Sequence, residues 1–546
     1  MTKQKGSDLL VRALENEGVE RIFAVPGEEN LDVLESLRTS TIELVLMRHE
    51  QPAAFMAATY GRLTGKPGVV LTTLGPGATN LTTAAAYAQL GGMPMVMITG
   101  QKPILSEPQA QFQIVDIVGM MAPLTKLSRQ IVSTAMIPTT VRNAFRIATE
   151  ERPGAVHLEL PEDIAAELGD EPLVRPHAMV LPVAADAALD AAAERLLAAE
   201  RPLVLIGAAA NRSRLVPSLS RFIRRTRLPF VNTQMGKGAV DGAGDLYLGT
   251  AALSEGDYVH DAIDQADLIL AIGHDTVEKP PFLMTGRPRE VIHVGFGPAA
   301  VEEVYFPQYE VIGDIAGGLD QLGDRLEGKL HHDLGFFLSL RSQILAHVNE
   351  GSQDGRFPPV PQRIVHDVRQ ALPDDGVVTL DNGTYKIWFA RGYRTHLANT
   401  ILLDNALATM GAGLPSGMMA AMLDPARKVI AVAGDGGFMM NSQELESAVR
   451  LGLNLVVLIV EDGSYGMIRW KQSQAGFTDW GLQFGNPDFV KYAEAYGAKG
   501  TRVQRTEDLL PILRQALDEG GVQLVVVPVD YSENQRVLID ELKNRR

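Results

Sequence analysis

Residues 428–436 read KVIAVAGDG, and residues 454–463 read NLVVLIVEDG. Each is an apolar run of strand length that ends in an acidic turn with glycine, and the stretch between them has a helical pattern. The segment is therefore predicted to be a βαβ unit, whose parallel strands bring Asp435 and Asp462 to the same edge of a sheet. Two carboxylates beside glycines, which let a phosphate approach the backbone, predict a site for Mg²⁺ and a diphosphate.

Apolar strand-like runs alternate with helical patterns along the whole chain, among them RIFAVPG, PLVLIGA and GVVTLDNG. Such runs are typical of parallel sheets that helices cover on both faces. They fall into three series of about five strands, which predicts an α/β fold with three doubly wound parallel-sheet domains. Two stretches rich in Pro and charge separate the series, so we expect domains at 1–170, 185–345 and 360–546. The first and third domains open alike, which indicates a weak internal repeat.

The composition narrows the classes of partner. Among 546 residues, the acidic side chains outnumber the basic ones and the formal net charge is −16, which argues against nucleic acid or an anionic membrane as partner. The chain has no cysteine, which excludes disulfides, thiolate metal sites and a cysteine nucleophile. The N-terminal stretch enters an amphipathic helix without a signal-peptide pattern, and no apolar run has the length of a membrane span. We therefore expect a cytoplasmic protein.

A second signal lies in the first domain. His49-Glu50-Gln51 follows a strand-like run, and the stretches GKPGVVLTTLGPGATNL and GGMPMVMITGQ come after it. In order and spacing, these stretches resemble the pyrimidine-binding domain of thiamine-diphosphate enzymes of the acetolactate synthase (acetohydroxyacid synthase) family. The resemblance continues through VNTQMGKGAVD, ATMGAGLPSGMMAA, AGDGGFMMNSQELESAVRLGLNL and FGNPDFVKYAEAYGAKG, so it covers essentially the whole chain.

The resemblance implies an activity and an assembly. The activity is the decarboxylating condensation of two pyruvate molecules to 2-acetolactate and CO₂ through hydroxyethyl-thiamine diphosphate. The three domains would then be the pyrimidine-binding, central and diphosphate-binding domains, and the cofactors thiamine diphosphate and Mg²⁺. Enzymes of this family place active sites between subunits, which implies a homodimer or homotetramer.

The resemblance also assigns roles to single residues. Glu50 matches the acid–base group that acts on the aminopyrimidine of the cofactor. Asp435, Asp462 and the backbone carbonyl of Ser464 match the Mg²⁺ ligands, and Met410 matches the apolar wedge that bends the cofactor. The other residues that match cofactor-binding positions are Gly383, Thr384, Tyr385, Ala408, Gly436, Gly437, Phe438, Tyr465, Gly466 and Met467.

Two departures distinguish this chain within the family. Glu461-Asp462 stands where most relatives have two asparagines, which resembles the catabolic acetolactate synthases. The biosynthetic enzymes bind FAD through an Arg-Phe-Asp-Asp-Arg stretch after a strand of the central domain. Here the corresponding strand continues as His274-Asp275-Thr276, so FAD is not expected.

The residues around the expected reaction centre favour ligation over simple decarboxylation. Thiamine-dependent pyruvate decarboxylases carry a His-His pair that aligns near Phe112-Gln113, and this chain lacks it. Gln113 is the candidate that orients the second pyruvate. Glu28 replaces a glycine of the family, and it either influences proton transfer or simply starts the helix that follows.

Three alternatives stay open. The chain could be a related thiamine-dependent 2-oxoacid decarboxylase or carboligase with another substrate, a flavin-dependent pyruvate oxidase, or a non-catalytic protein with the same fold. The presence of Glu50 and of both metal-binding carboxylates speaks against the last of these.

Overall fold

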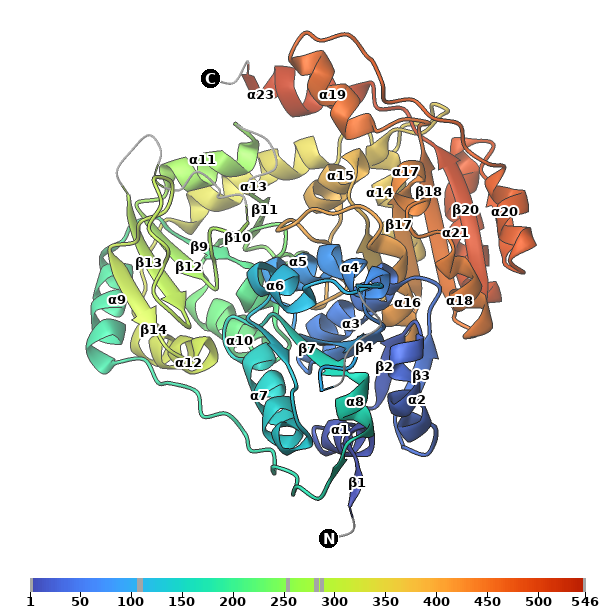
Figure 1. Cartoon of the computed structure of the whole chain (residues 1–546). Coiled ribbons are helices and arrows are strands. Elements are labelled where there is room, and N and C mark those ends of the chain that lie inside the picture. Colours follow the sequence, from blue (N-terminus) through green and yellow to red (C-terminus); the bar gives the residue numbers. More distant parts are fainter. Residues whose placement is uncertain (1–2, 106–110, 252–255, 279–283, 285–288, 544–546) are drawn as a thin grey trace. The chain divides into compact units, whose positions relative to one another are not determined.

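The computed structural model describes residues 3–105, 111–251, 256–278, 284 and 289–543 (Figure 1). These residues form two compact units. The first consists of Met1–Val180, Met418–Leu423 and Asn441–Leu451, and the second of Leu181–Gly417, Asp424–Met440 and Gly452–Arg546. No helix among the described residues is both long enough and apolar enough to cross a membrane.

The first unit is built on a six-stranded parallel sheet with the order β3-β2-β4-β5-β7-β6. Its strands are β2 (Arg21–Ala24), β3 (Glu43–Leu46), β4 (Gly68–Thr72), β5 (Met95–Gln101), β6 (Leu127–Gln130) and β7 (Ala155–Pro161). Its longer helices are α1 (Gly6–Asn16), α2 (Leu31–Arg38), α3 (Glu50–Thr64), α5 (Thr82–Gly91) and α7 (Ile137–Thr149). A short antiparallel pair, β1 (Gln4–Lys5) with β8 (Leu168–Gly169), joins the two ends of this region.

The second unit contains two further six-stranded parallel sheets, and the first of these has the order β11-β10-β9-β12-β13-β14. Its strands are β9 (Pro202–Ile206), β10 (Phe230–Asn232), β11 (Tyr247–Thr250), β12 (Leu268–Ile272), β13 (Glu290–Gly295) and β14 (Tyr309–Ile312). The helices that belong to it are α9 (Asp186–Ala198), α10 (Val216–Thr226), α11 (Tyr258–Gln265), α12 (Ile315–Leu326) and α13 (Leu334–Val348).

The other sheet of the second unit has the order β16-β15-β17-β18-β20-β19. Its strands are β15 (Val377–Leu380), β16 (Ile401–Leu402), β17 (Val429–Gly434), β18 (Leu455–Glu461), β19 (Lys499–Arg502) and β20 (Val522–Pro528). The helices of this part of the chain include α14 (Pro361–Ala371), α15 (Thr384–Gly392), α16 (Gly413–Leu423), α17 (Asp435–Phe438), α18 (Glu444–Arg450), α19 (Gly466–Gln474), α20 (Phe489–Ala495) and α21 (Leu509–Glu519).

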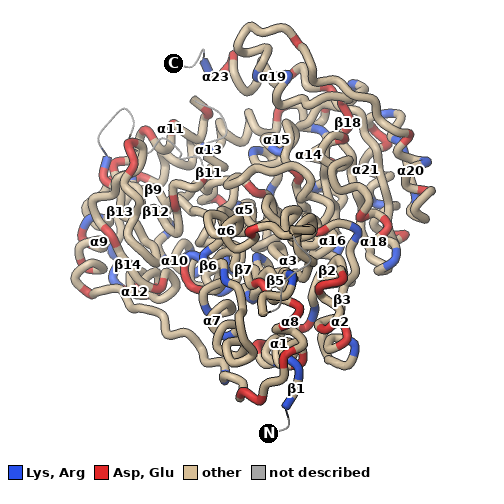
Figure 2. Tube along the Cα trace, viewed as in Figure 1, with Lys and Arg blue, Asp and Glu red and all other residues tan. Residues whose placement is uncertain are grey.

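The apolar runs of the sequence become strands that are buried on both faces. In β9, Val204 and Ile206 pack into a core with α9, α10 and α12, whereas Leu203 and Leu205 pack into a second core with α11 and α13. Alternate side chains of a strand point to opposite faces, so one continuous run fills both cores. In Figure 2 the strands are largely tan, and basic and acidic residues are interspersed over helices and loops. The prediction of an α/β fold with three parallel sheets is confirmed, with six strands in each sheet rather than about five.

Each sheet has a point at which consecutive connections leave in opposite directions, so that the strand order reverses. In the first sheet this point lies between β2 and β4, and in the third it lies between β15 and β17. The first and third sheets share one strand order, which gives the weak repeat in the sequence a structural basis. Loops diverge at such a point and leave a crevice at the carboxyl ends of the strands, where open α/β sheets bind their ligands. The predicted site residues follow these strand ends.

Candidate functional site

The predicted pair of acidic turns forms at the carboxyl edge of the third sheet. Strands β17 and β18 are parallel neighbours, with Gly434 opposite Val460, so both turns emerge at the same edge. The Asp435 side chain is buried. Its carboxylate oxygens accept hydrogen bonds from N–H groups whose nitrogen atoms lie 2.7–3.2 Å away. The donors are the backbone amides of Gly436, Asp462 and Gly463 and the side chain of Asn486.

The two acids of the second turn have different environments. Glu461 pairs with Arg502, with 2.6 Å between Oε2 and Nη1, so its charge is already balanced. Asp462 lies next to Asp435, and burial, with the charge of Asp435 as the next cause, raises the pKa of Asp462 to about 6. The Arg469 guanidinium, 3.3 Å from the Asp462 carboxylate, offsets part of this rise. Asp462, and not Glu461, is therefore the second acid of the candidate metal site.

Unsatisfied polar atoms near these turns fit a metal and a diphosphate. The hydroxyls of Ser464 and Thr384 are buried and have no hydrogen-bond partner within the described structure. The carbonyl of Ser464 accepts the amide of Gly466 at 2.9 Å and keeps a second lone pair. A Cβ on Gly466 would lie 2.5 Å from the Asp462 carboxylate and 3.4 Å from the Thr384 hydroxyl, so the carboxylate and the hydroxyl lie close to each other beside Gly466. Carboxylate, hydroxyl and carbonyl oxygens are the ligands that Mg²⁺ prefers.

Helix α15 begins at the reversal point of the third sheet. Gly383 is its N-cap, so the amides of Thr384 and Tyr385 in the first turn have no carbonyl partner within the helix. Such a helix end attracts phosphate. The short helix α17 contributes the other predicted diphosphate-binding residues, Gly436, Gly437 and Phe438.

A buried acid that the sequence did not single out organises these loops. Asp381 follows β15 and accepts the amide of Gly411 at 2.9 Å. A Cβ on Gly437 would lie 2.5 Å from the Asp381 carboxylate, so the loop has room only for glycine there. Burial raises the pKa of Asp381 to about 6. The signal in the sequence was an acid directly after a strand, in TLDNG.

The remaining predicted cofactor residues lie in the second unit, in the segment before α16 and at the start of α19. Ala408 has φ 55° and donates its amide to Asp404 at 2.7 Å, which fixes the half-buried segment that contains Met410. Tyr465 is 39% exposed and contacts Phe484 edge to face. Met467 follows in the first turn of α19 and is half-buried.

In the first unit, Glu50 is the first residue of α3. Its side chain is 12% exposed, and its Oε2 atom accepts the Asn80 amide at 2.9 Å. A Cβ on Gly77 would lie 3.5 Å from the other carboxylate oxygen, so the turn after β4 borders Glu50. Gln113 is exposed, has φ 59°, and lies with its backbone against Gly75 of the same turn. The structure thus brings Glu50 and Gln113 to one turn of the first sheet.

The buried acid at the other side of this reversal point is Glu29, whereas its neighbour Glu28 is exposed. Lys102 donates to Glu29 at 2.6 Å, and Thr73 donates to its other oxygen. Burial raises the pKa of Glu29, but the hydrogen bonds from Lys102 and Thr73 outweigh it and hold the pKa below its ordinary value. This pair was not predictable from the local sequence, because its members lie 73 residues apart.

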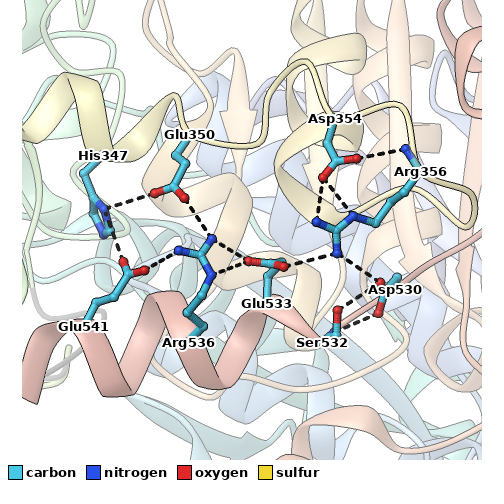
Figure 3. Close-up of polar contacts among 9 residues, drawn as sticks. All are labelled: His347, Glu350, Asp354, Arg356, Asp530, Ser532, Glu533, Arg536 and Glu541. Atoms are coloured by element: carbon cyan, nitrogen blue, oxygen red, sulfur yellow. Dashed lines mark hydrogen bonds and ion pairs between the residues drawn. The ribbon is translucent and has the colours of Figure 1, made fainter.

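Another group of potential metal ligands lies in the second unit. His347, Glu350 and Glu541 could offer atoms within 4.8 Å of one another. Arg536 hydrogen-bonds to both acids, as Figure 3 shows. A fixed guanidinium charge between the carboxylates disfavours a metal cation, so this cluster is an ion-pair network between the end of α13 and the C-terminal helical segment.

Comparison with known proteins matches each region of the chain. The three family models are described as "Thiamine pyrophosphate enzyme, N-terminal TPP binding domain" for residues 4–120, "central domain" for 189–322 and "C-terminal TPP binding domain" for 381–527. Acetolactate synthase of Bacillus subtilis is 34% identical and covers 99% of this chain and 96% of its own length. The catabolic acetolactate synthase of Raoultella terrigena is 36% identical, with coverages of 97% and 96%. Acetolactate synthase isozyme 2 large subunit of Escherichia coli is 32% identical, also with 97% and 96%.

The Glu29–Lys102 pair supports a stability prediction. We expect Lys102→Met to lower the free energy of unfolding by about 3–5 kcal/mol, because it leaves the Glu29 carboxylate buried without its cation. The control is Lys5→Met. Lys5 pairs with Asp32 at 2.7 Å but is half exposed, so this change should lower the stability much less than Lys102→Met does. Urea unfolding measures the free energy of unfolding of both variants. An equal decrease in the two would show that the buried Glu29–Lys102 pair stabilises the protein no more than the exposed pair does.

Proposed function

Because the chain belongs to the thiamine pyrophosphate enzymes of the acetolactate synthase family, we propose that it condenses two pyruvate molecules to 2-acetolactate and CO₂. The observation that carries this proposal is the full-length similarity to acetolactate synthases, together with the adjacent turns of Asp435 and Asp462. When bound, thiamine diphosphate supplies a carbon nucleophile that adds to a 2-oxoacid and accepts the electrons left by loss of CO₂.

We propose that some of the site residues bind the cofactor and that another transfers a proton. We assign Asp435, Asp462 and the Ser464 carbonyl to Mg²⁺, and the loops at Gly383 and Gly436 to the diphosphate. We assign Glu50 to proton transfer, in which its carboxylate would hold a proton for the aminopyrimidine of the cofactor. Its hydrogen bond to Asn80 and its low exposure favour a fixed orientation away from bulk water.

The residues at Phe112 and Gln113, where we place the second pyruvate, differ from those of the decarboxylases of this family. Phe112 and Gln113 stand where decarboxylases of this family have two histidines. Two residues without an acidic proton at these positions would favour addition to a second carbonyl compound over protonation, and we assign the Gln113 amide to orienting that second pyruvate. Glu28 stays a candidate for proton transfer to the product. We place this chemistry in the cytoplasm.

We propose that the enzyme works without FAD. In the central sheet, the Glu278 carboxylate accepts the amides of Ala208 and Met235 at 3.2 and 2.9 Å. These amides follow β9 and β10, next to the point where the strand order reverses. Nucleotide phosphates bind at such amides in related sheets, and here a buried acid already occupies them.

Product analysis tests the reaction. Pure protein with thiamine diphosphate, Mg²⁺ and pyruvate should yield acetolactate without a yellow flavin absorbance band. Glu50→Gln should lower kcat by about 10²–10⁴-fold, because the acid–base group is lost, and should still bind the cofactor. Acetaldehyde as the product in place of acetolactate would identify a decarboxylase, and full activity of the variant would overturn the role of Glu50.

Metal removal tests the candidate Mg²⁺ site. After dialysis against EDTA, we expect the protein to lose thiamine diphosphate, because Asp435 and Asp462 then repel the diphosphate without a cation between them. Asp462→Asn removes one of these charges and should retain more cofactor without Mg²⁺ than the unchanged protein does. Glu461→Gln is the control, since Glu461 pairs with Arg502. Equal retention with and without Mg²⁺ in the unchanged protein would contradict the assignment.

We further propose that the chain forms a homodimer or homotetramer whose active sites lie between subunits. Glu50 belongs to the first compact unit and Asp435 to the second. In an intersubunit site, each catalytic centre combines Glu50 of one chain with Asp435 of another.

Subunit mixing tests this arrangement. Glu50→Gln and Asp435→Asn should each be inactive alone. Coexpressed, they should recover about a quarter of the full activity, since half of the dimers are mixed and each mixed dimer has one intact site. A site within one chain predicts no recovery, because every chain in the mixture carries one defect.

A further inference from the structure

A cavity of about 410 Å³ lies in the second unit, away from the residues assigned above. Helices α14 and α15 and the end of α13 line it. Residues 362, 365, 366, 369 and 370 of α14 contribute, and this spacing corresponds to one face of the helix. The helix α15 begins at the proposed diphosphate loop but reaches the cavity with its other end, at Trp388, Arg391 and Gly392.

The charged lining of this cavity is basic. Three arginines, Arg369, Arg391 and Arg394, contribute to it, and no acidic side chain is among the lining residues that the structure describes. Arg391 is neutralised by Asp257 through two hydrogen bonds of 2.9 Å. The other two arginines therefore determine the charge that a ligand would meet.

Arg369 is held in place without being neutralised. Its guanidinium donates to the carbonyls of Leu372 and Pro373 at 2.6 and 2.8 Å. Its nearest carboxylate is that of Asp374, at 3.7 Å, and this side chain is 72% exposed. An exposed partner at this distance offsets little charge.

Arg394 is half-buried and has no carboxylate within 4.0 Å among the described residues. The acids on the neighbouring loop are engaged elsewhere. Glu350 binds Arg536 at 2.9 Å and Asp354 binds Arg356 at 2.8 Å, as Figure 3 shows. A half-buried guanidinium without a counter-ion favours an anion from solution.

A second polar group of the cavity also lacks a partner. Gln362 is 7% exposed, and its Oε1 atom is buried without a hydrogen bond within the described structure. A buried acceptor without a hydrogen bond is unfavourable, and a ligand with an N–H or O–H group removes this cost by donating to it. Val348, Val365 and Trp388 supply apolar wall, and the Trp388 ring is fixed by its bond to Asn534 at 2.8 Å.

We propose that this cavity binds a small organic anion, a carboxylate that also carries a hydroxyl or ammonium group. Arg394 and Arg369 hold the carboxylate, and Gln362 accepts the hydrogen bond of the second group. The volume lies in the range of small-molecule sites. None of these residues belongs to the proposed catalytic machinery, so the cavity is a second binding site.

Calorimetric titration of the cofactor-loaded protein with 2-hydroxybutyrate and with 2-aminobutyrate tests the proposal. We expect at least one of them to bind, and to bind more tightly than butyrate, which lacks the donor group. The compound that binds shows whether the group that donates to Gln362 is the hydroxyl of a hydroxy acid or the ammonium of an amino acid. If neither binds, the proposal is wrong.

Variants place the binding in this cavity. Arg394→Gln and Gln362→Leu should each weaken it at least about tenfold, because each removes one polar contact. Arg175→Gln is the control for charge, since Arg175 is an exposed residue of the first unit. Unfolding curves should confirm that all three variants are folded. Binding that stays at full strength in both Arg394→Gln and Gln362→Leu would overturn the assignment and point to the catalytic site instead.

Discussion

The carboxylate of Asp435 holds the end of β17 to the end of β18. One buried side chain accepts the amides of Asp462 and Gly463, which belong to the neighbouring turn, and also the side chain of Asn486. A buried carboxylate is tolerated only when it is well hydrogen-bonded. The same bonds hold the two turns side by side, so the local structure of this sheet edge, and with it the proposed metal site, depends on one group.

The reversal of strand order explains why the candidate residues gather where they do. In the first sheet, the turns after β2 and β4 carry Glu29 and Gly77, and Gly77 borders Glu50. In the third sheet, the turns after β15 and β17 carry Asp381 and Asp435. Helices that leave in opposite directions open a crevice at these points. The two sheets use one topology for two halves of the proposed chemistry.

The strands and the closeness of Asp435 to Asp462 were predictable from the local sequence. The strands follow from continuous apolar runs, since a strand covered on both faces needs apolar side chains at every position. The pairing of Asp435 with Asp462 follows because consecutive strands of a βαβ unit are parallel and lie near each other. The roles of Glu28 and Glu29 did not follow, because two adjacent acids look alike until one of them is buried against Lys102.

The fold class, the family and the pairing of the Asp435 and Asp462 turns could be predicted from the sequence, because they depend on apolar runs and motifs that are continuous along the chain. Only the folded chain shows which acids are neutralised. Arg502 pairs with Glu461 and Lys102 pairs with Glu29, whereas Arg394 has no carboxylate partner among the described residues. Such pairings join residues that are distant along the chain. Their strength depends on burial and distance, which a one-dimensional pattern does not contain.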